Sequence, residues 1–174
     1  MLVESEDSSV LVEGERFLVA CGTRPAHNPE IPFDGKRILD TDQLTRIGAV
    51  PREAIVVGAG IVGLEYASVL AALGVEVTLI DQRPTLLDFV DRQIVEALSF
   101  HLRDLGTILR LGEKVVSIGI DEQRDHVYAQ LESGKKVHAE ILLYAVGRCA
   151  NADQLDAESA GLKPDEREIG RAHV

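Results

Sequence analysis

The chain has 174 residues, 45% of them apolar, and its 29 acidic against 18 basic side chains give a formal net charge of −11. This length and composition allow one ordinary hydrophobic core and indicate a soluble globular protein. Because an acidic chain repels phosphate backbones and anionic lipid, we expect neither a nucleic acid nor a membrane as partner. The apolar runs are far shorter than the roughly 20 residues that span a bilayer, and no signal peptide is recognisable.

The two cysteines, Cys21 and Cys149, lie 128 positions apart and show no C-x-x-C spacing. This pattern argues against a disulfide framework and predicts a reducing, cytoplasmic location, with both thiols as packing residues. The histidines have no spacing typical of a metal site or a catalytic triad, so we predict no metal and interpret them as surface or core residues. They are His27, His101, His126, His138 and His173.

The first elements in chain order are short. Residues 8–20 read as two apolar strands around the turn pair Glu13-Gly14, which predicts a small antiparallel hairpin. Three of the six prolines fall within residues 21–37, so this segment is predicted to be an extended linker. Residues 38–51 predict a short helix with Thr41 or Asp42 as its N-cap.

An alternation of strands and helices follows. The pattern predicts a buried strand at 54–57, a helix at 61–74 that is apolar all round, and a second strand at 75–81. An amphipathic helix is predicted at 91–105, and a third strand at 107–110. We expect that helix to be capped near Asp91 and to share one buried face among Ile94, Leu98 and Leu102.

The remaining segments read as strands only: KVVSIGID, HVYAQLE and KVHAEILLYAV. The last of these finishes in an apolar strand at 140–146. This change of pattern indicates a β-meander packed against a βαβ core. The predicted fold class is therefore α/β, with a Rossmann-like parallel sheet and a β-meander.

The segment AIVVGAGIVGLEYASVL, residues 54–70, holds three glycines in G-x-G-x-x-G spacing. A diphosphate requires backbone amides and the positive end of a helix dipole at close range, and a Cβ at the approach points would hold it off. Gly58 would make the tight turn, Gly60 would admit the diphosphate, and Gly63 would let the helix pack on the strand. Between a predicted strand and a predicted helix, this motif indicates dinucleotide binding.

Asp81 ends the second predicted strand, 23 positions after Gly58. A carboxylate about 20 residues beyond the glycines accepts hydrogen bonds from the adenosine ribose, and it favours NAD because it repels a 2′-phosphate. Arg83 leaves two interpretations open. Its guanidinium could pair with a 2′-phosphate, so that NAD and NADP are both accepted, or it is an exposed arginine in a loop.

Glu65 also has two interpretations. Near the start of the glycine-led helix, its carboxylate could simply complement the positive helix end, a contribution of about 0.3–1 kcal/mol. The functional interpretation places it near the nicotinamide end of the cofactor.

FLVACGTRP at 17–25 and ILLYAVGRCANADQL at 141–155 flank this domain. They resemble the ATG-type and GR-x-x-N-type segments of the pyridine nucleotide-disulfide oxidoreductase superfamily, the two-dinucleotide flavoproteins, in which an NAD(P) domain is inserted into an FAD domain. The resemblance covers residues 8–167. Within the superfamily, RILDTDQL and LIDQRPTLLDFVD are most similar to the soluble pyridine nucleotide transhydrogenases, with the lipoamide dehydrogenases as near relatives.

The resemblance implies a set of binding residues and no catalytic residue within this chain. Cys21 stands where threonine is common in the family, and CAN follows Gly147-Arg148 where x-P-N or x-G-N is commoner. FAD would contact Cys21, Gly22 and Thr23. The nicotinamide dinucleotide would be held by Gly58, Ala59, Gly60, Ile61, Val62, Gly63, Leu64 and Glu65, its adenosine ribose by Asp81 with Arg83, its adenine side by Val115 and its nicotinamide side by Gly147.

By the same resemblance, the parent protein would pass hydride from NADPH to NAD through FAD, and would form a homo-oligomer through a C-terminal domain. A dihydrolipoamide dehydrogenase or related disulfide reductase is the alternative, and the chain alone would be an inactive nucleotide-binding fragment. The implied domains are a piece of the FAD domain at 1–25, a linker at 26–47, the NAD(P) domain at 48–146 and a return to the FAD domain at 147–167. The tail EIGRAHV, 168–174, resembles a translated sequencing adapter, so we expect the gene to continue differently after Arg167.

Overall fold

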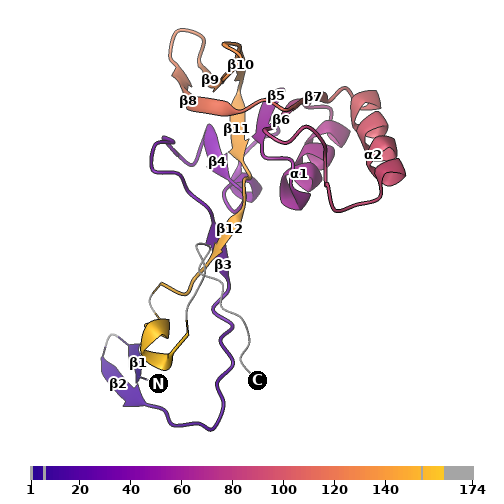
Figure 1. Cartoon of the computed structure of the whole chain (residues 1–174). Helices are drawn as coiled ribbons and strands as arrows, with labels where there is room; N and C mark the ends of the chain where they lie inside the picture. Colours follow the sequence, from indigo (N-terminus) through magenta and orange to yellow (C-terminus); the bar gives the residue numbers. More distant parts are fainter. Residues whose placement is uncertain (1, 6, 154, 163–174) are drawn as a thin grey trace. The chain divides into compact units, whose positions relative to one another are not determined.

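The computed structural model describes residues 2–5, 7–153 and 155–162 (Figure 1). The described residues form two compact units, one of residues 24–149 and the other of those up to Thr23 together with those from Ala150 onward. The expectations for 163–167, for the tail 168–174 and for His173 concern residues outside this description. No helix in the described part is long and apolar enough to cross a bilayer.

A five-stranded parallel sheet forms the centre of the larger unit. Most of its strand residues are buried, which is typical of a parallel sheet covered on both faces. Its order is β4 (Ile38–Asp40), β11 (Ile141–Tyr144), β5 (Glu53–Val57), β6 (Glu76–Asp81) and β7 (Ile108–Leu111). The strands predicted at 54–57, 75–81 and 107–110 are confirmed within a residue or two.

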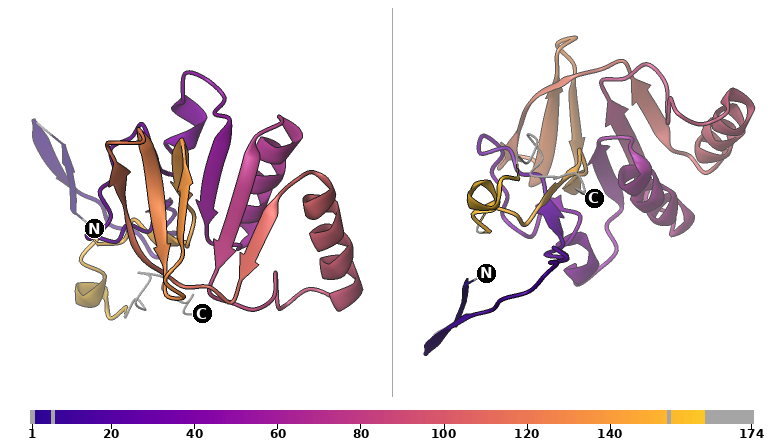
Figure 2. Two further views of the ribbon diagram at one scale, coloured as in Figure 1. Left: turned by 90° about the horizontal axis from the view of Figure 1, so that it is seen from above. Right: turned by 60° about the horizontal axis from the view of Figure 1, so that its bottom comes forward.

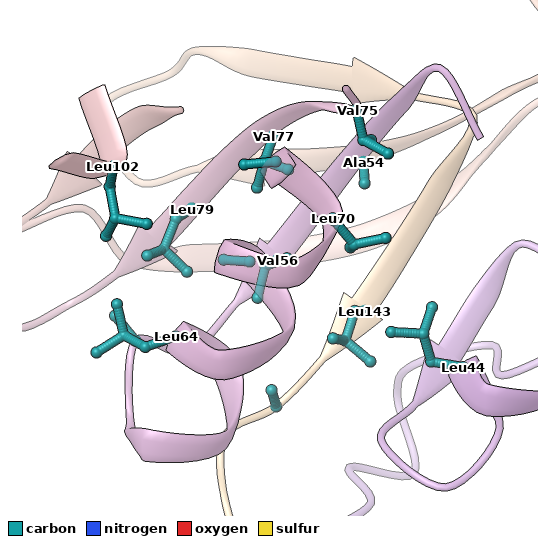
Figure 3. Packing of buried hydrophobic residues seen from close by; sticks show 14 of the residues in the cluster. Leu44, Ala54, Val56, Leu64, Leu70, Val75, Val77, Leu79, Leu102 and Leu143 are labelled. Carbon is teal, nitrogen blue, oxygen red and sulfur yellow. The ribbon is translucent and has the colours of Figure 1, made fainter. Parts of the chain in front are cut away.

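Two helices cover one face of this sheet, α1 (Ile61–Ala72) and α2 (Arg92–Asp104). Leucines and valines from the helices and the strands interdigitate between these layers (Figure 3). After α1, the Gly74 amide donates to the Ala71 carbonyl and the Val75 amide to the Leu70 carbonyl, at 2.9 and 3.0 Å. This pattern terminates a helix and requires a left-handed residue, which glycine supplies at φ +85°.

The start of α2 is as predicted, but its buried face is not. The Asp91 carboxylate caps the helix by accepting from the Gln93 amide at 2.9 Å. Leu102 is fully buried, whereas Ile94, which we expected on the same face, is 62% exposed. Val95 packs on the core in place of Ile94, because the spacing from Val95 to Leu102 is two full helical turns.

A three-stranded antiparallel meander covers the other face of the sheet, as the left view of Figure 2 shows. Its strands are β8 (Val115–Asp121), β9 (His126–Leu131) and β10 (Lys136–Ala139). Alternate residues of β9, Val127, Ala129 and Leu131, are buried in a second hydrophobic core, which lies between the meander and the sheet. The three-layer α/β architecture confirms the predicted Rossmann-like fold with a meander.

The single strand expected over 136–146 is divided. β10 belongs to the meander and β11 to the parallel sheet, with the break at Glu140. The Glu140 carboxylate accepts a hydrogen bond from the Arg52 amide at 2.8 Å, and this holds the chain where it changes sheets. An unbroken run of strand-forming residues gave no sign of the change, because propensity does not specify the pairing partner.

The prediction for residues 38–51 is wrong in two respects. Residues 38–40 form β4, a buried strand paired with β11, and the helix is reduced to a 3₁₀ turn at Leu44–Arg46. The N-cap of this 3₁₀ helix is Gln43, without a side-chain capping bond, so neither Thr41 nor Asp42 is its cap. Asp40 instead holds the turn that precedes the helix: its Oδ1 accepts from the amides of Asp42 and Gln43, each at 2.9 Å. Pairing with β11 gives this apolar segment a row of backbone hydrogen bonds. A single helical turn would give it one hydrogen bond at the entropic cost of fixing three residues.

The smaller unit contains a hairpin that differs from the one we expected. β1 (Leu2–Ser5) and β2 (Ser8–Leu11) pair with Ser5 opposite Ser8, so the strand at 8–11 finds its partner upstream, and Glu13-Gly14 is not a hairpin turn. A two-residue connection fixes such a register with the least loop-closure entropy. β3 (Thr23–Pro25) pairs with β12 (Arg148–Ala150), and a 3₁₀ helix follows at Ala157–Ala160.

Candidate nucleotide-binding site

The glycine motif lies at the carboxyl edge of the parallel sheet, where β5 ends and α1 begins. We refer to residues 58–63 as the fingerprint turn. Gly58 has φ +101°, and its amide donates to the Ile80 carbonyl at 2.8 Å. A methyl group on Gly58 would lie 2.5 Å from the Ala145 carbonyl oxygen, so the backbone directly after β11 occupies that space. Both the backbone angle and the close approach therefore require glycine here.

Gly63 is needed for a different reason. Within α1, a methyl group at this position would overlap the carbonyl oxygen of Gly58 and would lie 3.4 Å from the Ala145 side chain. The absence of a Cβ lets the first turn of the helix lie directly on the end of β5. Close packing within the protein thus explains why glycine is needed at positions 58 and 63, without any ligand.

Gly60 differs from both. Its φ of −73° and ψ of −177° suit any residue, and a methyl group added there would meet no atom within 4 Å. It is the N-cap of α1, where no side chain caps the helix and no acidic residue occupies the first turn. The described protein gives no steric reason for a glycine at the open, positive end of this helix.

Asp81 connects the fingerprint turn to the end of β6. Its Oδ2 accepts from the Ala59 amide at 2.6 Å and from Nη2 of Arg83 at 2.7 Å. Its Oδ1 accepts from the amide and from Nε of Arg83, at 2.8 and 3.0 Å. The Asp81 side chain is only 6% exposed, while that of Arg83 is 39% exposed.

These contacts determine the ionisation of the pair. Burial alone would raise the pKa of Asp81, but hydrogen bonds from Arg83 and Ala59 together with the charge of Arg83 hold the pKa below its ordinary value of 3.8. The hydrogen bond to Asp81 is the main cause that raises the pKa of Arg83. The pair is therefore fully charged at neutral pH.

The other residues predicted to bind the nucleotide lie on α1, at the start of β8 and after β11. Ile61 and Glu65 are exposed on α1, Val62 is half-buried, and Leu64 belongs to the core, so only its backbone could face a ligand. Glu113 donates its amide to the Asp81 carbonyl at 3.1 Å, which brings the segment just before Val115 to the end of β6.

Gly147 follows β11, the strand on the other side of β5 from β6. It has φ +151° and accepts from the Ala26 amide at 3.0 Å. In the smaller unit, Cys21, Gly22 and Thr23 are exposed. Asn151 Nδ2 donates to the Cys21 carbonyl at 3.1 Å.

Sequence reasoning missed a polar junction at the end of β4. Arg148 donates Nη1 to Asp42 Oδ1 at 2.8 Å and to the Thr41 hydroxyl at 3.2 Å. The Tyr66 hydroxyl of α1 donates to the Thr41 carbonyl at 3.0 Å. The hydrogen bond from Arg148 is the main cause that lowers the pKa of Asp42. Through Thr41, the junction links Arg148 to α1. In the sequence, the signal for it was the pair Gly147-Arg148.

The described residues include no group of three or more histidine, cysteine, aspartate or glutamate side chains arranged to hold a metal ion. The polar groups that converge at the carboxyl edge of the sheet are instead backbone amides, one carboxylate and one guanidinium. This set suits an anionic ligand that carries hydroxyl groups.

Comparisons with known proteins identify the family of the chain. The family model described as pyridine nucleotide-disulphide oxidoreductase matches residues 2–171. The soluble pyridine nucleotide transhydrogenases of Mycobacterium tuberculosis and Photobacterium profundum are each 42% identical to the chain, over 163 and 164 residues, or 94% of it. The chain spans about a third, 34%, of the length of these two relatives.

Solved structures show the same relationship. LpdA from Mycobacterium tuberculosis is 27% identical, with a TM-score of 0.87 over 97% of this chain and 36% of its own. The HOCl-induced flavoprotein disulfide reductase RclA from Escherichia coli is 26% identical, with a TM-score of 0.81 over 95% of this chain and 38% of its own. By its sequence, its fold and its fingerprint turn, the chain belongs to the pyridine nucleotide-disulphide oxidoreductase family.

Proposed function

We propose that the chain is the NAD(P)-binding part of a flavoprotein oxidoreductase that transfers hydride between NADPH and NAD through FAD. The transhydrogenase names of relatives that match 94% of the chain support this choice. When bound, the nicotinamide and the flavin supply the hydride chemistry, and the protein supplies binding, orientation and electrostatics.

One observation carries the proposal. Gly60 has open space where a Cβ would stand, has an ordinary backbone conformation, and precedes the uncapped amides of α1. A glycine that the fold does not require is explained if a diphosphate occupies that space, because a Cβ would hold its oxygens away from the amides. Gly58 and Gly63 lack this property, since the protein fills the space around them.

The remaining site residues follow from this position. The adenosine ribose would meet Asp81 at the end of β6, and adenine would lie toward Val115. The other half of the dinucleotide would extend past β5 to the end of β11, where Gly147 would face the nicotinamide. Ligands of open α/β sheets lie at this carboxyl edge, where the strand order reverses. FAD would contact the segment Cys21–Thr23.

The variant Gly60→Ala tests the carrying observation. We expect its free energy of unfolding to stay within about 1 kcal/mol of wild type, the range for replacing glycine by alanine at an N-cap. NADH binding should weaken at least tenfold, or by about 1.4 kcal/mol. Chemical denaturation and titration calorimetry measure the two quantities.

Gly48→Ala is the matched control. Gly48 is exposed, has no atom within 4 Å of the added methyl, and lies outside the fingerprint turn. We expect it to change neither stability nor binding. Equal NADH affinity in the Gly60→Ala and Gly48→Ala variants would remove the main support for the proposal.

The names of the structural neighbours favour a second candidate, a dihydrolipoamide dehydrogenase or related disulfide reductase, because RclA is described as a flavoprotein disulfide reductase. The upstream gene sequence distinguishes the two: a C-x-x-x-x-C pair after a first FAD helix would favour the reductase. With either parent protein, we expect the chain by itself to be a nucleotide-binding module without catalysis. Turnover of any acceptor by the purified chain with FAD and NADPH would count against that last expectation.

A further inference from the structure

We propose that Arg83 is a specificity-determining residue that competes with the nucleotide for the Asp81 carboxylate, so that it opposes NAD and favours NADP. The inference rests on the proposed function, since it requires the adenosine ribose to bind Asp81. It differs from the simple view of Arg83 as an added phosphate contact, because it gives the same side chain opposite effects on the two nucleotides.

The hydrogen bonds of the carboxylate carry the argument. An ionised carboxylate has about four acceptor positions, two on each oxygen. In Asp81 all four are occupied: Oδ1 by the amide and Nε of Arg83, and Oδ2 by Nη2 of Arg83 and the amide of Ala59. A ribose hydroxyl can therefore donate to Asp81 only after one of these four donors has left.

The guanidinium is the donor that can leave. The Ala59 amide is fixed in the fingerprint turn, and the backbone of Arg83 is held at both ends, by its own amide on Asp81 and by its carbonyl, which accepts from the Gly112 amide at 2.9 Å. The Arg83 side chain is 39% exposed and can rotate into solvent without moving the chain. Its departure frees one acceptor position on each oxygen, which suits the two hydroxyls of a ribose.

The cost of this departure differs between the nucleotides. NAD replaces two hydrogen bonds from a charged guanidinium by two from neutral hydroxyls and leaves the guanidinium without its carboxylate partner, so the ion pair opposes binding. NADP brings a 2′-phosphate to the same place, and the displaced guanidinium can pair with that phosphate by two parallel hydrogen bonds. Asp81 repels that phosphate, and the displaced guanidinium offsets the repulsion by pairing with it. The same side chain thus opposes NAD by holding Asp81 and favours NADP by neutralising its phosphate.

The test is the affinity of NADH and NADPH for wild-type chain and for the Arg83→Ala variant, by titration calorimetry. We expect Arg83→Ala to bind NADH two- to tenfold more tightly and NADPH at least tenfold more weakly. Arg83→Lys keeps the charge but cannot form the bidentate pair, so it should bind NADH more tightly than wild type and NADPH with intermediate affinity. It also provides a second variant if Arg83→Ala is poorly folded.

Arg92→Ala is the matched control for net charge. Arg92 lies on α2 with a side chain that is 91% exposed, and it pairs with Glu96. The Arg92→Ala variant removes the same charge as Arg83→Ala and should leave the ratio of the NADH and NADPH affinities unchanged. If wild type binds both nucleotides and both Arg83 variants bind NADH no more tightly than wild type, this inference is overturned and the proposed function stands. If folded wild type binds neither nucleotide, the proposed function itself fails, and the inference fails with it.

Discussion

Replacing Gly63 by alanine is expected to lower the free energy of unfolding by about 3 kcal/mol, the upper range for overpacking a close contact. Helix propensity alone would give the opposite sign, because alanine is favoured over glycine inside a helix by about 1 kcal/mol. The methyl group would overlap the Gly58 carbonyl oxygen, which is backbone and cannot rotate away. Relief requires α1 to move from β5, and α1 contributes Leu64 and Leu70 to the core.

Urea unfolding of the Gly63→Ala variant beside wild type measures this effect. Gly48→Ala, in an open loop, reports the intrinsic effect of adding a methyl group and should be nearly neutral. A Gly63→Ala variant as stable as wild type, or more stable, would show that the helix does not lie as close to the strand as the structure describes.

The second large effect is expected for Asp81→Asn, a loss of about 2 kcal/mol at neutral pH. Hydrogen bonds to a charged group contribute about 1.5–3 kcal/mol, and the partial exposure of Arg83 places the pair toward the lower part of that range. Asparagine keeps the shape and one acceptor oxygen but loses the charge. The amide of Ala59 and the guanidinium of Arg83 then compete for that one oxygen.

The pH dependence of this loss has a defined sign. The pKa of Asp81 is lowered in the folded protein, so its contribution to stability is complete above the ordinary value of 3.8 and is lost as the pH falls through the lower folded value. The difference between wild type and Asp81→Asn should therefore be constant from pH 7 to about pH 5 and shrink below about pH 4. A difference that persists undiminished to pH 2 would contradict the assignment of the charge to Asp81.

The central elements of the fold could be predicted from the sequence because local pattern determines them. The buried run before Gly58, the apolar helix after it and the capping carboxylate of Asp91 are each encoded within a few residues. Pairing is a different matter. The chain moves from the meander to the parallel sheet at Glu140, and β4 joins β11 across about 100 residues of sequence, so no local pattern could show either event.

The candidate site shows the same division. The glycine spacing and Asp81 were visible as a linear motif. The saturation of the Asp81 carboxylate by Arg83 and Ala59 depends on side-chain rotamers and on a contact between the end of β6 and the fingerprint turn, which spacing cannot specify. The contact of Arg148 with Asp42 joins residues 106 positions apart and was not anticipated.

The most direct test of the account is a calorimetric titration of the folded wild-type chain with NADH and with NADPH. Backbone amides at the start of α1 and the carboxylate of Asp81 should bind one molecule of either nucleotide, and the two should compete for the same site. A folded sample that takes up neither nucleotide would contradict the central claim.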